Sequence, residues 1–277
     1  MIIEYDIPNG NSIETVSDWV ELSVTLTGDE ISKTEVAAAI RSSLGDEPSG
    51  AFISDVWAEL KRRLELYGSR PPYEVNELEV LPLTSFAANP AYVFCLVLSL
   101  EGNPVQPTVT GKLFERLCNE ALKSYLGGET LTFGYPGTIT VQHLCQLTGE
   151  QFKRELPAAA NDRGLDVVGW KPLDSRGNQI IVFMQCAGGK NWRSKTTDVV
   201  MRAWTEKYVG FHVKPTRAFA TPISITNLDV FEEVSFETDL LFDRPRIYNN
   251  TVTLVPTASL AVEISDWCQE RLADLLY

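Results

Sequence analysis

An acidic residue and an amide residue stand out in two neighbouring apolar segments of the chain. Asp166 interrupts the run at residues 165–170, and Gln185 ends the run at residues 180–185. Both runs are rich in β-branched and aromatic residues, and the segment 174–178, DSRGN, suits a reversing loop, so the sequence predicts a β-hairpin. A polar side chain in a buried strand costs free energy unless it has partners or a task. Carboxylate and amide oxygens in such a place can bind a divalent cation.

The alternation of side chains along a strand places the two residues on matching faces. Asp166 points the same way as Val168 and Trp170, and Gln185 points the same way as Phe183. If the strands are neighbours in suitable register, Asp166 and Gln185 converge near one end of the sheet. The ordinary alternative for Asp166 is a buried carboxylate that accepts backbone N–H hydrogen bonds.

An acid on one strand, followed by an acid or Gln with a nearby Lys on the next, resembles the core of the PD-(D/E)XK nucleases. This is the fold of restriction endonucleases, and the resemblance is closest to the Mrr-type restriction enzymes, whose second half-motif often reads Gln-x-Lys. The family core runs helix, three strands, helix, strand, and the chain has candidates for all six between about residues 109 and 223. The resemblance implies an α/β (α+β) fold with a restriction-endonuclease-like core. The core would span residues 106–225; apolar spacing predicts a mainly helical N-terminal region at 1–105 and a C-terminal helical extension at 226–277 that packs on the core.

The resemblance also assigns roles to individual residues. Asp166 would be the principal metal ligand, Gln185 would take the place of the second acid, and the backbone carbonyl of Cys186 would be a further oxygen ligand. The expected cofactor is Mg²⁺ (or Mn²⁺), since phosphodiester hydrolysis needs an activated water and stabilisation of extra negative charge on the phosphate.

A supporting carboxylate is expected from the helix predicted at residues 110–126. Glu115 and Glu120 border the apolar stripe of this helix on opposite edges, and periodicity does not choose between them. The resemblance favours Glu115, because the first core helix of Mrr-like nucleases often carries a Phe-Glu pair that brings its carboxylate to the metal. An exposed carboxylate is the ordinary alternative for either residue.

The chain departs from the family pattern at the lysine. The residue two positions after Gln185 is Ala187, which can neither orient water nor offset charge. The nearest candidate is Lys190, which follows a Gly-Gly pair that can let the backbone fold back or can be an ordinary turn. Arg193 and Lys195 are weaker substitutes. The predicted catalytic set is therefore Asp166, Gln185 and Lys190, and loss of activity is an open alternative.

Charge is distributed unevenly along the chain. The formal net charge is -13, yet residues 61–223 carry more bases than acids, and the segment 188–217 alone has seven bases against two acids. A local basic patch can contact phosphates even on an acidic protein, although a solvated helix face gives the same pattern. The candidate nucleic-acid-binding residues in this segment are Lys190, Arg193, Lys195 and Arg202.

Several other classes are disfavoured by the sequence. The five cysteines are odd in number and widely separated, and there are only two histidines, so neither a disulfide framework nor a zinc site is indicated. The phosphate-loop, dinucleotide-binding, serine-hydrolase and zinc-protease motifs are absent from the sequence. No apolar run is long enough for a membrane helix and no signal-peptide pattern is present, so a cytoplasmic location without membrane contact is expected.

Apolar spacing and turn residues predict the remaining elements. Helices are expected at residues 18–27, 34–44, 52–67, 110–126 and 141–148, from Asn89-Pro90 to residue 100, shortly after Trp192, and along a stripe that includes Leu260, Ile264 and Trp267. Strands are expected at 78–83, 130–135 and 218–225 in addition to the hairpin, with loops at 102–107 and 161–164.

The leading functional hypothesis is a metal-dependent DNA nuclease that acts as a bacterial anti-phage or restriction effector. The role in defence is inferred only because Mrr-like domains usually occur in such systems. The second hypothesis is a catalytically degenerate nuclease-fold subunit, serving as a DNA-binding or protein-interaction component of a larger defence complex. A third is a plain interaction module. The expected partners are DNA, another protein subunit of a defence system and, as a further option, a second copy of the chain.

Overall fold

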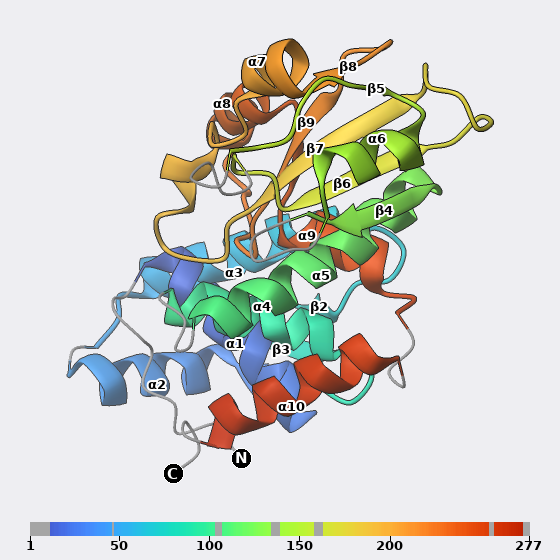
Figure 1. Ribbon diagram of the computed structural model, residues 1–277. Helices are drawn as coiled ribbons and strands as arrows, with labels where there is room; N and C mark the ends of the chain where they lie inside the picture. The colour runs from blue at the N-terminus through green and yellow to red at the C-terminus, as the bar shows by residue number, and fades with distance from the viewer. Residues whose placement is uncertain are drawn as a thin grey trace. The chain divides into compact units, whose positions relative to one another are not determined.

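The computed structural model describes residues 12–45, 47–102, 107–133, 139–157, 163–254 and 258–273 (Figure 1). The chain divides into two compact units, each formed by the described parts of separate segments. The first unit comprises Met1–Val105, Pro222–Thr226 and Arg244–Tyr277, and the second comprises Gln106–Thr221 and Asn227–Asp243. Residues 226–277, expected as one extension, are therefore shared between the two units. In the described ranges no helix is long and apolar enough to span a membrane.

The first unit is mainly helical. Its elements are α1 (Ile13–Thr27), β1 (Ile31–Ser32), α2 (Lys33–Leu44), α3 (Gly50–Leu66), β2 (Tyr73–Val75), β3 (Glu79–Pro82), α4 (Pro90–Glu101), α9 (Arg244–Thr251) and α10 (Ser259–Ala273). The predicted helices and the strand near residue 80 are confirmed, whereas β1 and β2, which pair with β3 in a small antiparallel sheet, were not expected. Helix α4 begins where predicted, because the Asn89 side chain accepts from the Tyr92 N–H and Pro90 follows it. The helix is buried on nearly every side, and α1, α9 and α10 all contact it.

The second unit is built on a mixed sheet. Its elements are α5 (Pro107–Leu126), β4 (Glu129–Thr132), α6 (Val141–Thr148), β5 (Gln151–Phe152), β6 (Val167–Lys171), β7 (Ile180–Cys186), a 3₁₀ helix (Trp192–Lys195), α7 (Met201–Ala203) with a π-helical turn (Trp204–Tyr208), β8 (Val209–Gly210), β9 (Thr216–Ala220), α8 (Leu228–Thr238) and β10 (Leu240–Phe242). The sheet order is β10-β9-β7-β6-β4, with β4, β6 and β7 antiparallel in turn and β9 and β10 parallel to β7. A mixed α/β fold is thus present, and the predicted hairpin is the β6–β7 pair.

Two predicted strands differ from the observed ones at their ends. The strand expected at 218–225 is β9, which ends at Ala220. The Thr221 N–H still donates to the Phe242 carbonyl, but Pro222 has no N–H and cannot extend the ladder. The strand expected at 130–135 is β4, and residues 134 and 135 lie outside the described residues, as do most of the loops expected at 102–107 and 161–164.

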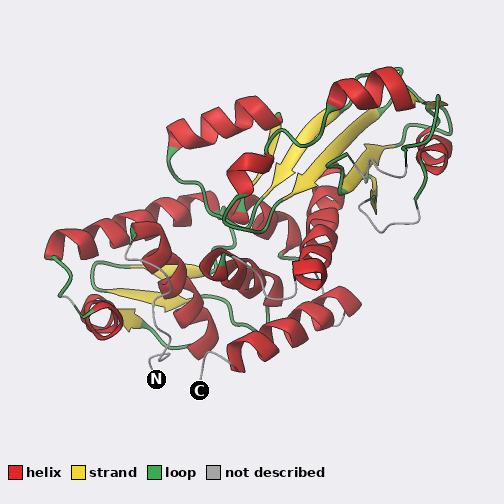
Figure 2. Cartoon of the chain, turned by 60° about the vertical axis from the view of Figure 1, so that its left-hand side comes forward, coloured by secondary structure: helices red, strands yellow, loops and turns green. Residues whose placement is uncertain are grey.

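The sheet of the second unit is covered differently on its two faces. On one face Val168, Ile181 and Phe183 join a buried cluster with Trp204 and residues of α6. On the other face lies α5 (Figure 2). This second contact is close, because a Cβ atom added to Gly169 would come within 2.8 Å of leucine side chains of α5. Glycine in the middle of β6 therefore lets the helix approach the strand.

Candidate functional site

Asp166 and Gln185 lie on neighbouring strands, as predicted. Val167 of β6 pairs with Met184 of β7, so Asp166, directly before β6, comes beside Gln185 near the end of β7. The Asp166 N–H donates to the Met184 carbonyl at 3.0 Å, and the Asp166 carbonyl accepts from the Phe133 N–H at 2.7 Å. Backbone hydrogen bonds to both sides therefore fix the position of the carboxylate at this edge of the sheet.

The Asp166 carboxylate is buried and bound to the neighbouring strand. The residue is 8% exposed, and its Oδ2 accepts a hydrogen bond from the Cys186 N–H at 2.7 Å. This bond is the ordinary role that the sequence left open for a buried aspartate. It also holds the charged oxygen next to Gln185, because Cys186 is the following residue.

Gln185 supplies the least ordinary feature of the site. The residue is 8% exposed, and its side-chain oxygen Oε1 has no hydrogen-bond partner among the described residues. A buried amide oxygen without a partner costs free energy, and such atoms are few in folded proteins. An oxygen of this kind beside a buried carboxylate is suited to meet a ligand that is not part of the chain.

The supporting acid Glu115 lies on α5, which covers the face of the sheet toward which Cys186 points, opposite to the face of Phe183 and Gln185. Burial and a hydrogen bond with the Cys118 thiol raise the pKa of the Cys186 thiol well above its ordinary value. The negative charges of Asp166 and Glu115 raise this pKa further, so both carboxylates act on one thiol. Glu115 also pairs with Lys112 at 2.7 Å. A metal at this place would therefore compete with Lys112 for the Glu115 carboxylate.

Lys190 is not brought into contact with the two strand residues. Its side chain is exposed, and it makes no hydrogen bond or ion pair with any described residue. Gly188 and Gly189 are not among the described glycines with positive φ, so the turn does not use the conformational freedom of glycine. The chain nevertheless folds back over the sheet, because the Trp192 ring lies 6.1 Å from the ring of Phe219 in β9.

The remaining bases of the segment 188–217 have mixed environments. Arg193 is exposed and its guanidinium lies 5.2 Å from the Trp192 ring centre. Arg202 forms an exposed ion pair with Glu206 at 2.9 Å, so it is already engaged. The Lys195 side chain, like that of Lys190, has no hydrogen bond or ion pair within the described ranges. Arg193, Lys190 and Lys195 are thus the candidates best placed to meet phosphates.

The described residues offer only part of a metal site. Among them no group of three or more His, Cys, Asp or Glu side chains is arranged to hold a metal ion directly. The Asp166 carboxylate and the unpartnered Gln185 oxygen are hard donors, and they fit Mg²⁺, which usually keeps several waters and takes one or two carboxylates from the protein.

A residue that sequence reasoning missed lies on the next strand. Thr221 follows β9, is fully buried, and its hydroxyl Oγ1 has no hydrogen-bond partner in the described part of the chain. No local pattern marks it, because its surroundings depend on the pairing of β7, β9 and β10.

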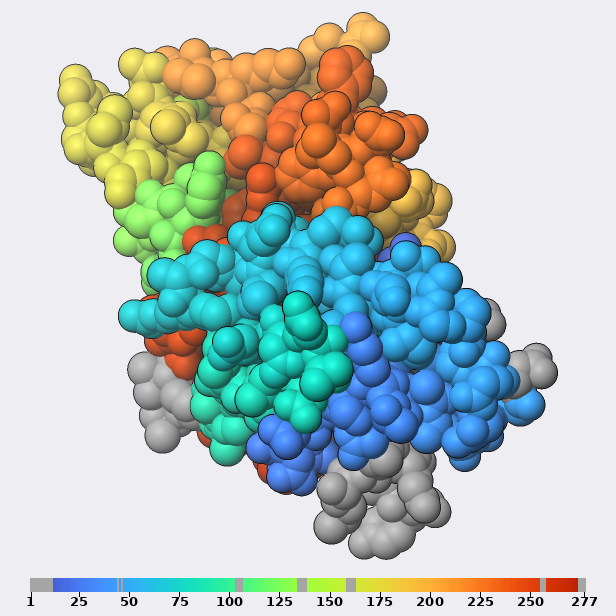
Figure 3. All heavy atoms as spheres, turned by 180° about the vertical axis from the view of Figure 1, so that it is seen from behind, coloured from blue at the N-terminus to red at the C-terminus, as the bar shows by residue number. Residues whose placement is uncertain are grey.

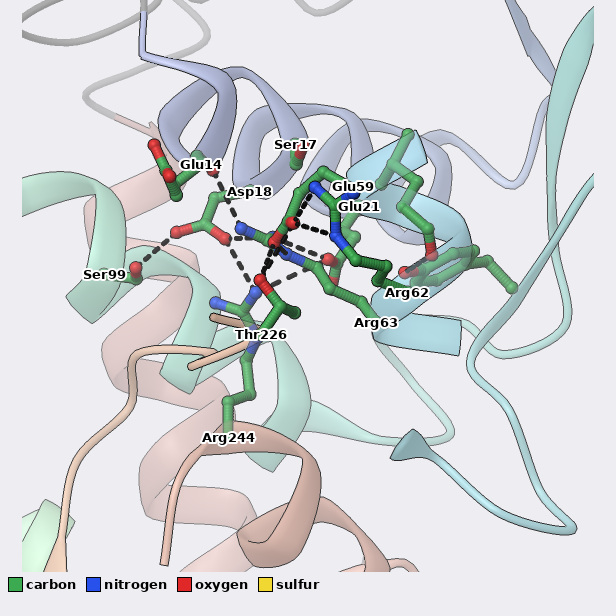
Figure 4. Close-up of polar contacts among 12 residues, drawn as sticks. Glu14, Ser17, Asp18, Glu21, Glu59, Arg62, Arg63, Ser99, Thr226 and Arg244 are labelled. Atoms are coloured by element: carbon green, nitrogen blue, oxygen red, sulfur yellow. Dashed lines mark hydrogen bonds and ion pairs between the residues drawn. The ribbon is translucent and has the colours of Figure 1, made fainter. Parts of the chain in front are cut away.

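The first unit contains a second polar cluster, centred on two buried arginines (Figure 4). Arg63 contacts Asp18 at 2.5 Å, Glu21 at 2.8 Å and Glu59 at 2.8 Å. Arg244 contacts Asp18 at 2.6 Å and Glu21 at 3.4 Å. The three carboxylates and the two guanidinium groups therefore compensate one another inside the unit.

Hydroxyl groups complete this cluster. Tyr92 and Tyr67 donate to Glu21 Oε2, Ser99 donates to Asp18 Oδ2, and Thr226 donates to both oxygens of Glu59. The members serve as partners for one another, so the cluster joins α1, α3, α4 and α9 and is a structural network. Its residues were not predicted, because each looks like an ordinary solvated charge on an amphipathic helix.

The fold and the strand-edge residues define a mixed α/β protein with a buried carboxylate and amide at one edge of its larger sheet. Comparison of the chain with protein-family models, with curated proteins and with solved structures finds no match.

Proposed function

We propose that the second unit is a metal-dependent DNA nuclease of the restriction-endonuclease-like type. The observation that carries the proposal is the edge of the β6–β7 pair, where the buried Asp166 carboxylate binds the Cys186 N–H next to the unpartnered Gln185 oxygen. The order of elements supports it. Helix α5 is followed by β4 and, after α6 and β5, by β6 and β7, which make three antiparallel strands of the larger sheet; the helical segment α7 and β8 then lead to β9, parallel to β7.

In this proposal Asp166 binds Mg²⁺ (or Mn²⁺), with the Gln185 amide oxygen and the Cys186 carbonyl as further oxygen donors. Glu115 becomes a further ligand when its carboxylate releases the Lys112 ammonium group and binds the metal ion. The bound cation would stabilise the negative charge that develops on the phosphate and lower the pKa of the attacking water. Burial of Asp166 at the sheet edge keeps its carboxylate ordered for this task.

Lys190 is the proposed catalytic lysine in place of Ala187. Its exposed side chain lies on the turn that folds over the sheet and is not held by another described residue, so it can turn toward a bound phosphate. Lys190, Arg193 and Lys195 would contact the DNA backbone, while Arg202 would contribute less because it already pairs with Glu206. A role as an effector of bacterial restriction or anti-phage defence, in the cytoplasm, belongs to the same proposal.

A second candidate function is a degenerate nuclease-fold subunit that binds a protein partner. Ala187 at the lysine position favours it, and so does the surface of α8 (Figure 3). This helix exposes Leu228 and Phe236, at 66% and 89%, among several glutamates. Large apolar side chains exposed on an acidic helix are typical of contact with another protein.

The test is incubation of the purified chain with supercoiled plasmid and Mg²⁺ or Mn²⁺. Asp166→Ala should abolish nicking, since it removes the charged ligand, and Lys190→Ala should lower it by roughly 10²–10³-fold, as for loss of one charge-stabilising group. Gln185→Ala should have a milder effect. The matched control is Asp174→Ala, in the exposed loop between β6 and β7, which should leave nicking unchanged.

Circular dichroism of each variant separates loss of the site from loss of the fold. Nicking that survives Asp166→Ala would show that the site is elsewhere. A wild-type chain that binds DNA without cutting it under any metal would replace the nuclease proposal with the degenerate subunit.

A further inference from the structure

Helix α8 presents an aromatic side chain at the centre of its solvent face. Phe236 is 89% exposed, whereas Val234, on the opposite side of the helix, is buried. Successive residues turn by ~100° around a helix, so the three exposed acids Asp229, Glu232 and Glu233 all lie within about 60° of the direction of this ring. We call these three acids and Phe236 the acidic strip.

The charges of the acidic strip are not compensated by neighbouring side chains. None of its three carboxylates forms an ion pair or a hydrogen bond within the described part of the chain. The segment 227–243 carries six acids and no base, whereas residues 106–221, the rest of the second unit, carry fifteen bases and ten acids. The second unit is therefore polarised, with its negative charge concentrated in and around α8.

A basic strip lies beside α8 on the same unit. The hydroxyl of Thr196, directly after the 3₁₀ helix, donates to Glu237 Oε2 in the last turn of α8 at 2.7 Å. In Figure 3 this segment, in gold, borders the orange surface of α8. The segment carries Lys190 and Arg193, which are exposed, and Lys195, which is half-exposed. We call these three bases the basic strip.

Two adjoining strips of opposite charge make this surface complementary to itself. A two-fold contact uses the same surface on both copies, so the acidic strip of each copy can meet the basic strip of the other. Direct contact between two α8 helices would instead bring like charges together, which costs free energy. A foreign basic partner would compensate the acidic strip alone and leave the basic strip without a counterpart.

Phe236 is suited to be the apolar centre of such a contact. Aromatic side chains near the centre of an interface often carry much of the binding free energy. Leu228, 66% exposed and ~12 Å earlier along the helix axis, extends the apolar surface. The partner copy would offer the Arg193 guanidinium, which already lies 5.2 Å from the Trp192 ring centre and can also contact a second aromatic ring.

We infer that the second unit binds a second copy of this chain, with the acidic strip of each copy on the basic strip of the other. The inference extends the second candidate function, because it names the partner of α8, and it does not depend on nuclease activity. The bases of the basic strip are also the proposed contacts of the DNA backbone. The dimer and DNA would therefore compete for them.

The experiment is sedimentation velocity of the whole chain, without DNA or metal, over a wide range of protein concentration. Wild-type protein should show a monomer–dimer equilibrium that added salt shifts toward the monomer, because the contact joins exposed charges. Phe236→Ser should raise the dissociation constant by about 30-fold or more, the effect of losing a central aromatic contact. Its thermal midpoint should stay the same, since the ring is exposed.

Two charge-reversed variants test the pairing of the strips. The acid-reversed variant is Glu232→Lys with Glu233→Lys, and the base-reversed variant is Arg193→Glu with Lys195→Glu. Each variant alone should be monomeric, because both of its strips then carry the same sign. An equimolar mixture of the two should form heterodimers, because both contacts become attractive again.

A matched control separates this pairing from a general effect of net charge. Asp55→Lys with Glu65→Lys changes the net charge as the acid-reversed variant does, but on the exposed side of α3 in the first unit. This control should dimerise as the wild type does, and it should not form heterodimers with the base-reversed variant. Rescue by the control as strong as rescue by the acid-reversed variant would overturn the inference.

Three other results would also overturn it. These are a chain that stays monomeric at every concentration, a dimer that survives Phe236→Ser and both charge reversals, and a mixture of the reversed variants without heterodimers. Nicking of DNA by a chain that is always monomeric would refute the dimer and leave the nuclease. A dimer with the expected charge dependence that never cuts DNA would refute the nuclease alone.

Discussion

Removal of Arg63 from the buried network of the first unit should destabilise that unit strongly. In Arg63→Met a side chain of similar length loses its charge and its bonds to Asp18, Glu21 and Glu59. Glu59 would keep Arg62 at 2.9 Å, and Asp18 would keep Arg244 at 2.6 Å. Glu21, which is fully buried, would have only Arg244 at 3.4 Å as a charged partner.

The expected cost follows from this uncompensated charge. Removing one partner of a buried ion pair costs about 3–5 kcal/mol, a large part of the ~5–15 kcal/mol that stabilises a typical domain. The neighbouring residue gives a matched control, because Arg62 also pairs with Glu59 but its side chain is 54% exposed. Arg62→Met should change the free energy of unfolding by only about 0–1 kcal/mol.

The assay is hydrogen exchange with mass spectrometry at increasing guanidinium concentration, which reports on each unit through its own peptides. Peptides of α1, α3 and α4 should lose protection at lower denaturant in Arg63→Met than in the wild type, while Arg62→Met should follow the wild type. Equal and small effects of the two substitutions would refute the view that the buried network holds these helices together.

Three further results are expected. Burial opposes ionisation of Glu59, but arginine charges and hydrogen bonds outweigh it and lower the pKa of the carboxyl. Its contribution to stability is therefore complete above the ordinary glutamate pKa and is lost as pH falls through the lowered value, so the thermal midpoint should drop on acidification below the ordinary glutamate range, and more steeply than in Glu59→Gln. Gly169→Ala should destabilise the second unit by about 1–3 kcal/mol in chemical denaturation, because the new methyl group meets α5. Gly111→Ala, with open space around it, should be neutral or stabilising, and similar effects of the two substitutions would contradict the close packing at Gly169. Charge reversal of Arg193 and Lys195 to Glu should weaken DNA binding for all sequences alike and flatten its salt dependence in fluorescence anisotropy titrations, and unchanged binding would mean that these bases are only solvated.

The parts of the fold that the sequence predicted are those set by local signals. Helix α4 starts at the Asn89-Pro90 pair, and the hairpin β6–β7 follows from two β-rich runs around one turn, so neighbouring residues are sufficient to locate them. Strand β10 has only three residues and depends on its pairing with β9, which no local pattern reveals. It was therefore included in a helical extension.

The candidate site was predictable in part for the same reason. Asp166 and Gln185 are recognisable because a polar residue interrupts an apolar strand. Thr221 is not, since a threonine at the end of a strand is ordinary until the pairing of three strands leaves its hydroxyl without a partner. The ion pair of Asp18 with Arg244 joins residues 226 positions apart, and only the folded chain brings them together.

The central claim is that Asp166 binds the metal ion required for DNA cleavage. Nicking of supercoiled plasmid, measured as a function of Mg²⁺ concentration, tests this claim most directly. The informative variant is Asp166→Asn, which keeps the size of the side chain and an oxygen for the Cys186 N–H but removes the charge. The account predicts Mg²⁺-dependent nicking by the wild type and none by Asp166→Asn at any Mg²⁺ concentration. Equal nicking by the two proteins would contradict it.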